Sequence, residues 1–93
     1  METMQVWVLS TAHISPQDRE TLLRLACDDY PWMSWHHGWL FLVPEDMSAP
    51  EYYPPTVLPV IAKARRLGFG WVRLDSDGPL DDDTDAPLQT FLA

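Results

Sequence analysis

Aspartates crowd one stretch of this chain, which reads WVRLDSDGPLDDDTD from Trp71 to Asp85. An apolar run that ends in Asp-x-Asp-Gly is typical of phosphoryl transfer, in which the first carboxylate attacks phosphorus and the second is acid and base beside Mg²⁺. That chemistry also needs a lysine and further acids downstream. Only 14 residues follow Pro79, and none of them is Lys or Arg. We therefore do not interpret the motif as a phosphatase site.

A calcium loop is the second chemistry that the stretch could support. Counted from Asp75, acids stand at positions 1 and 3, but Pro79 takes position 5 and glycine falls at position 4 instead of 6. Ala86 stands where a bidentate glutamate is required. The pattern therefore departs from a calcium loop, although loose cation binding by the aspartates stays open.

The histidines add little to a metal or hydrolase site. His36 and His37 are adjacent, so in a strand they would point to opposite faces, and Cys27 adds a single further ligand. No nucleophile elbow or glycine-rich phosphate loop is present. We expect no catalytic residue, no metal site and no cofactor, and we expect His13 to tie a loop to the sheet.

The net charge of the chain indicates which classes of partner it can bind. Fourteen acidic residues against six basic ones give −8 on 93 residues. Nucleic-acid binding depends on cationic contacts with phosphate, so direct DNA or RNA binding is disfavoured. An acidic field favours basic partners, while solubility alone is the other interpretation. A single cysteine and the absence of any long apolar run predict a cytoplasmic protein with no membrane contact.

Hydrophobic periodicity and capping signals predict the elements that hold these residues. Ser15 is the expected N-cap of a first helix, with Asp18 placed for a capping box. Thr56 is the expected cap of a second helix, which ends at Gly68. The predicted strands are 4–9, 39–43 and 71–74. The first predicted helix starts at residue 16, and the second spans 57–67. Whether residues 32–36 form an extra hairpin strand is left open.

The order β-α-β-α-β predicts one α/β domain over residues 1–93, with a three- to four-stranded sheet packed with two helices. Simple βαβ connections would make the main strands parallel, and the apolar strand 39–43 should be covered on both faces. Residues 75–87 form an acidic loop and 88–93 a short packed tail. The expected buried helix positions are Leu22, Leu23, Leu25 and Ala26, then Val57, Val60, Ile61, Ala64 and Leu67, while Lys63, Arg65 and Arg66 complement the second helix dipole.

Four segments, WVLSTAHIS, WLFLVPED, WVRLDSDGP and LQTF, resemble a small bacterial domain family of unknown function that is typical of plasmids and integrative elements. The aromatic ending usual in that family is missing, because the chain stops at TFLA. The resemblance implies a mobile genetic element and transfers no functional residue.

By analogy with small acidic proteins of such elements, the leading hypothesis is a non-enzymatic inhibitor of the anti-CRISPR or anti-restriction type. It would bind a basic protein or nucleoprotein complex and block nucleic-acid access. The expected contact residues are Asp75, Asp77, Asp81, Asp82, Asp83 and Asp85. The alternative is a small metal-binding domain or metal-dependent hydrolase using Asp75, Asp77 and His13. The many tryptophans and tyrosines would suit a protein partner or a homodimer.

Overall fold

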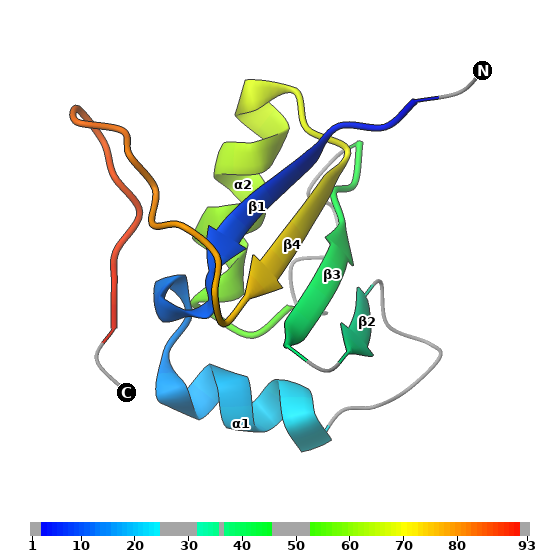
Figure 1. Ribbon diagram of the computed structural model, residues 1–93, viewed down its shortest axis with the longest axis vertical. Coiled ribbons are helices and arrows are strands. Elements are labelled where there is room, and N and C mark those ends of the chain that lie inside the picture. Colours follow the sequence, from blue (N-terminus) through cyan, green and yellow to red (C-terminus); the bar gives the residue numbers. More distant parts are fainter. Residues whose placement is uncertain (1–2, 25–31, 36, 46–52, 92–93) are drawn as a thin grey trace.

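The computed structural model describes residues 3–24, 32–35, 37–45 and 53–91. The chain alternates strands with helices (Figure 1). In order, the elements are β1 (Val6–Ser10), the 3₁₀ helix η1 (Thr11–His13), α1 (Pro16–Arg24), β2 (Trp32–Trp35), β3 (Gly38–Leu42), α2 (Val57–Leu67) and β4 (Trp71–Asp75). The prediction of a small α/β protein with two α-helices and a small sheet is confirmed.

The sheet has the strand order β1-β4-β3-β2. β1 runs parallel to β4, whereas β3 runs antiparallel to both β4 and β2. The element order is β-α-β-β-α-β instead of β-α-β-α-β. The parallel arrangement expected of simple βαβ connections therefore holds for β1 and β4 but not for β3. The physical reason is the hairpin from Trp32–Trp35 into Gly38–Leu42, because it reverses the chain before α2 crosses to β4.

Helix α2 packs one apolar stripe on the sheet. Val57, Val60, Ile61 and Ala64 are buried in one core cluster with residues of β3 and β4 such as Phe41, Val72 and Leu74. Gly68 ends the helix in the left-handed conformation (φ 88°) and donates its N–H to the carbonyls of the last turn, as the sequence predicted.

Two leucines that were expected in the core lie at the surface. Leu23 on α1 is 70% exposed and Leu67 at the end of α2 is 55% exposed. Of the residues expected on the buried stripe of α1, Leu22 is buried. The other two positions expected on that stripe, Leu25 and Ala26, lie outside the described residues.

The sheet has one face packed on α2 and one face on which none of the described helices packs (Figure 1). Along β3, Trp39 and Phe41 are buried, Leu40 is intermediate and Leu42 is 45% exposed. This alternation contradicts the expectation that the strand is covered on both faces. α2 lies behind the sheet and α1 below the ends of its strands, so neither covers the other face (Figure 1).

The N-termini of α1 and α2 share one hydrogen-bonded cluster. Ser15 caps α1 as predicted, because its Oγ accepts the Asp18 N–H at 3.0 Å. The Asp18 carboxylate turns to the other helix and accepts the Thr56 N–H at 2.7 Å and its hydroxyl. Thr56 makes no side-chain cap of its own. Its Oγ1 instead accepts the Ser15 N–H at 3.0 Å, so the expected role of Thr56 is corrected.

The C-terminal segment folds back against the body of the domain. Leu88 packs on the core cluster, and the Phe91 N–H donates to the Ala12 carbonyl at 2.8 Å. Leu88 and Phe91 thus contact the body of the domain, and Phe91 is the last described residue of the segment 88–93.

Candidate functional site

Lys63, the single lysine of the chain, organises the acidic segment. Its side chain is only 5% exposed, and Nζ lies 2.5 Å from Asp81 Oδ2 and 2.8 Å from Asp83 Oδ2. Nζ donates a third hydrogen bond to the Ala86 carbonyl at 2.7 Å. All three ammonium protons thus have oxygen acceptors. The expectation that Lys63 serves the helix dipole beside Arg65 and Arg66 is corrected.

The two aspartates that bind Lys63 also accept hydrogen bonds from the backbone of their own segment. Asp81 Oδ2 also accepts the Leu88 N–H at 3.0 Å, and Asp81 Oδ1 accepts the Asp83 N–H at 3.2 Å. Asp83 Oδ1 in turn accepts the N–H groups of Asp85 at 2.9 Å and Ala86 at 3.2 Å. Carboxylates that bond backbone N–H groups two or three residues ahead hold tight turns.

These contacts lower the pKa of both carboxyl groups. The Lys63 hydrogen bond and then the Asp85 and Ala86 N–H groups hold the pKa of Asp83 at about 2. Burial works to raise the pKa of Asp81, but the Lys63 ammonium and the Leu88 and Asp83 N–H groups outweigh it and lower that pKa. Burial opposes the charge on Lys63, and the two carboxylates overcome it, so its pKa is raised.

His13 anchors the same segment from the other side. Its Nδ1 lies 3.0 Å from the Gln89 carbonyl oxygen, and its Nε2 accepts the Asp81 N–H at 2.8 Å. This pattern requires the neutral tautomer with the proton on Nδ1. The ring is 2% exposed. As the sequence indicated, His13 is a structural tie, although it joins the η1 turn to the C-terminal segment.

The six aspartates predicted as one contact surface have three different environments. The Asp81 side chain is 3% exposed, and Asp83 shares the same internal ammonium. Asp75 is intermediate in exposure, accepts the Asp77 N–H at 2.9 Å and lies 3.9 Å from Arg73. The remaining three, Asp77, Asp82 and Asp85, are exposed.

The geometry gives no support to the alternative of a metal site built from Asp75, Asp77 and His13. Both ring nitrogens of His13 are engaged inside the protein. Within the described part of the chain, no three His, Cys, Asp or Glu side chains are placed to hold one metal ion. Asp75 and Asp77 belong instead to the turn that follows β4, where the Gly78 N–H donates to the Asp75 carbonyl at 2.9 Å.

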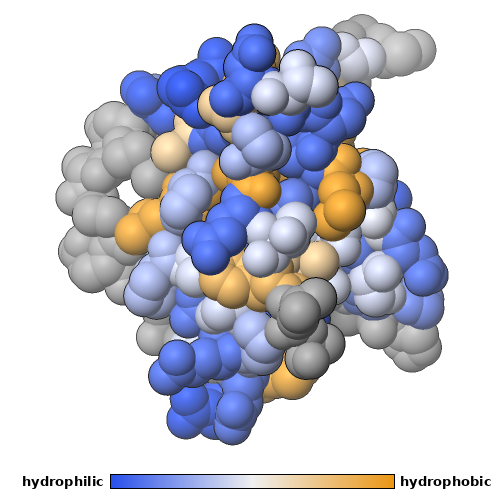
Figure 2. All heavy atoms as spheres, turned by 90° about the vertical axis from the view of Figure 1, so that its left-hand side faces the viewer, coloured by the Kyte–Doolittle hydropathy of each residue, from blue (hydrophilic) through white to orange (hydrophobic). Residues whose placement is uncertain are grey.

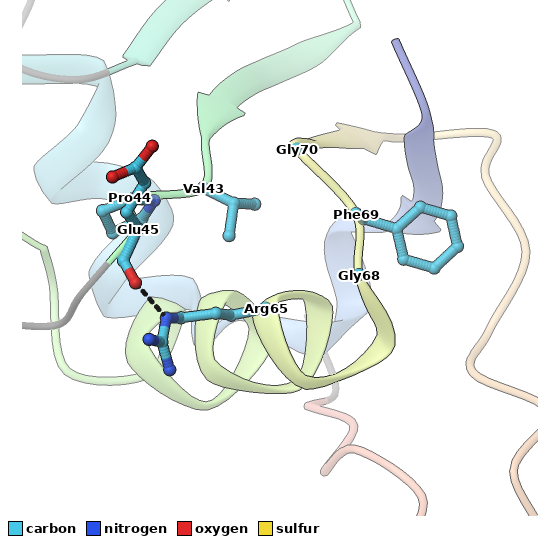
Figure 3. Close-up of a pocket in the computed structure, with 7 residues that line it drawn as sticks. All are labelled: Val43, Pro44, Glu45, Arg65, Gly68, Phe69 and Gly70. Atoms are coloured by element: carbon cyan, nitrogen blue, oxygen red, sulfur yellow. Dashed lines mark hydrogen bonds between the residues drawn. The ribbon is translucent and has the colours of Figure 1, made fainter.

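A groove of about 500 Å³ lies at the opposite end of β4 (Figure 3). Arg65 crosses it from α2 and donates from Nε to the Glu45 carbonyl at 2.7 Å, while the Phe69 ring points away and stacks on Trp7. Arg65 and Glu45 are the charged residues among those that line it. Apart from the Glu45 carboxylate, the described lining of this groove has no side chain of a type that acts as a nucleophile or base.

The sequence held one signal for the Lys63 cluster. Lys63 follows Val60 by three positions and precedes Ala64, so it falls on the buried stripe of α2. A lysine at such a position requires internal acceptors. Which aspartates supply them could not be read from spacing, because the segment returns to α2 only through its tertiary contacts.

The fold and this cluster define a small mixed-sheet α/β domain whose C-terminal segment is held by a buried ion-pair network. A family model described as "Family of unknown function (DUF5983) C-terminal domain" matches residues 6–86. The chain belongs to that family, which confirms the resemblance to an uncharacterised domain family. No curated protein and no solved structure matches it. Among the described residues, no helix is long and apolar enough to cross a membrane.

Proposed function

We propose that this protein is a small acidic, non-enzymatic interaction protein of a mobile genetic element. It binds a basic surface of a nucleic-acid-handling defence complex, of the anti-CRISPR or anti-restriction type, and blocks access of nucleic acid. The observation that supports this best is the set of exposed carboxylates Asp77, Asp82 and Asp85 on a segment anchored to the domain.

The anchoring matters because an ordered acidic segment binds at lower entropic cost than a free one. Lys63 and His13 fix the backbone at Asp81. Asp82 follows immediately and is exposed. Two acids are thus used inside to hold the segment, and their neighbours are presented to solvent.

The electrostatics favour a basic partner. The chain carries −8, and Lys63 offsets only part of the charge of the acids around it. Figure 2 views the side that includes the C-terminal segment and shows hydrophilic side chains over much of its upper and lower parts, with apolar residues between them. Interfaces commonly combine an apolar centre with a polar rim. The net negative charge of the chain would speed its association with a cationic groove.

The test uses purified CRISPR effector complexes and restriction enzymes, with DNA binding and cleavage as readouts. We expect the wild-type protein to inhibit at least one of them and to lose affinity as salt rises. The double variant Asp82→Asn and Asp85→Asn should weaken that inhibition about 10-fold or more, because it removes two exposed charges from the proposed surface.

A matched control removes the same charge elsewhere. Glu20 and Glu45 are exposed acids outside the segment, so Glu20→Gln with Glu45→Gln changes net charge equally. Equal loss in both double variants would mean that only total charge matters. Full inhibition by the Asp82→Asn and Asp85→Asn protein would exclude the proposed surface.

A further inference from the structure

The sheet face that points away from α2 carries an ordered set of cross-strand rows. In the register of β1, β4 and β3, the first row is Val6, Trp71 and Leu42, and the second is Val8, Arg73 and Leu40. The third row is Ser10, Asp75 and Gly38, of which Ser10 is buried and the Asp75 side chain is 14% exposed. We call these nine residues the open face. Figure 1 looks onto it, with α2 behind the sheet.

The first row is apolar and accessible. Val6 is 39% exposed and Leu42 is 45% exposed, while Trp71 is intermediate. Met4, 66% exposed, extends this row, because its sulfur accepts the Trp71 indole N–H at 2.8 Å. The row borders a groove of about 580 Å³ that Met4, Leu42 and Trp71 help to line. Contiguous apolar surface of this kind on a small protein marks an interaction site.

The charge on the open face decides which partner fits. Its charged residues are Arg73 and Asp75, so the face is neutral in a chain of net charge −8. A basic partner gains little there, because the excess acid of the chain lies elsewhere. Two copies of this chain, each of net charge −8, repel each other least when the regions that meet are neutral and apolar. A face used by two copies around a two-fold axis must also be self-complementary, and an apolar row meets this condition.

We infer that the open face is the interface of a homodimer, in which the row Val6, Trp71 and Leu42 packs against the same row of a second copy. Sheet-on-sheet packing with interdigitating side chains gives such an interface its usual geometry. The exposed aspartates of the C-terminal segment, Asp82 and Asp85, do not belong to this face, so dimerisation leaves the proposed acidic surface accessible. The inference therefore does not depend on the proposed function.

Sedimentation velocity and light scattering on the full chain, over concentrations up to about 1 mM, test the inference. We expect a concentration-dependent dimer, and we expect the Leu42→Glu and Val6→Glu variants to raise its dissociation constant about 10-fold or more each. Leu67→Glu is the matched control, since Leu67 is 55% exposed on α2 and lies outside the open face. It should leave the dimer intact. Circular dichroism verifies that each variant is folded.

Salt separates this interface from the proposed partner binding. Screening reduces the repulsion between two chains of −8, so added salt should strengthen the dimer, whereas it should weaken binding to a basic partner. A wild-type protein that stays monomeric up to about 1 mM would overturn the inference. So would a dimer that persists unchanged in the folded Leu42→Glu and Val6→Glu variants. Neither result bears on the proposed function, because the inhibition of DNA binding and cleavage is tested at Asp82 and Asp85.

Discussion

Lys63 Nζ and Asp81 Oδ2 form an ion pair of 2.5 Å whose two side chains are 5% and 3% exposed. The pair joins the middle of α2 to a segment 18 residues further along the chain. Buried charges are tolerated only where their partners are complete. Here Asp83 and the Ala86 carbonyl complete the ammonium, and two backbone N–H groups complete the Asp81 carboxylate.

The first prediction concerns this ion pair. Lys63→Met leaves the Asp81 carboxylate buried without its cation, so we expect a fall in Tm on the order of 10 °C. The double variant Lys63→Met with Asp81→Leu removes both charges and should be more stable than the single variant. Thermal melts followed by circular dichroism measure both. A single variant as stable as the wild type would contradict the burial of this pair.

The second prediction concerns acid pH. The pKa of Asp83 is about 2 in the folded protein against an ordinary value of 3.8, and that of Asp81 is also lowered. A carboxyl group whose pKa is lowered by folding stabilises the folded state, and this stabilisation is fully present at pH values above the pKa of the group in the unfolded chain. We therefore expect this contribution to be lost as pH falls from 3.8 towards about 2. Denaturant melts of the wild type and of Asp83→Asn should differ at pH 5 and converge near pH 2.

A third prediction tests the shared helix cap. Asp18→Ala removes the acceptor of the Thr56 N–H and hydroxyl, and we expect a loss of about 1–2 kcal/mol in the free energy of unfolding. Ser15→Ala removes the α1 cap at Asp18 and should cost about 1 kcal/mol. Urea melts provide both values. Glu20→Ala, at an exposed position on the same helix, is the control and should change stability by less than about 0.5 kcal/mol.

The fourth prediction compares two glycines at opposite ends of the sheet. A Cβ at Gly38 would lie 1.7 Å from the Leu74 carbonyl oxygen, whereas a Cβ at Gly70 would meet nothing within 4 Å. Gly38→Ala forces β3 away from β4, so we expect a loss of about 3 kcal/mol or more. Gly70→Ala should stay within about 1 kcal/mol of the wild type. Equal stability of the two variants would contradict the β3–β4 register.

Local signals in the sequence determined the helices, three strands, the Ser15 cap of α1 and the end of α2 at Gly68. Val57–Leu67 has the expected bounds of α2 because apolar spacing, Gly68 and the basic last turn act within one helix. The cap by Ser15 was predictable for the same reason, because it acts within three residues. His13 is a tie as expected, but its partners, Asp81 and Gln89, come from the C-terminal segment, which local signals do not reveal. The hairpin strand Trp32–Trp35 stayed open, because a short run with a turn at His37 and Gly38 fits a loop equally well.

Only the tertiary structure decided the strand directions and the use of the aspartates. β3 and β4 pair antiparallel because the connection through α2 returns to the end of the sheet where β3 stops, so that Leu42 pairs with Trp71. No local pattern encodes that return. Of the six aspartates in this stretch, Asp81 and Asp83 bind Lys63 and Asp75 lies 3.9 Å from Arg73, whereas Asp77, Asp82 and Asp85 are exposed. Sequence determined that a charged segment exists. The return of that segment to α2 decided which charges bind the protein itself and which stay available, because an ion pair depends on distance in space.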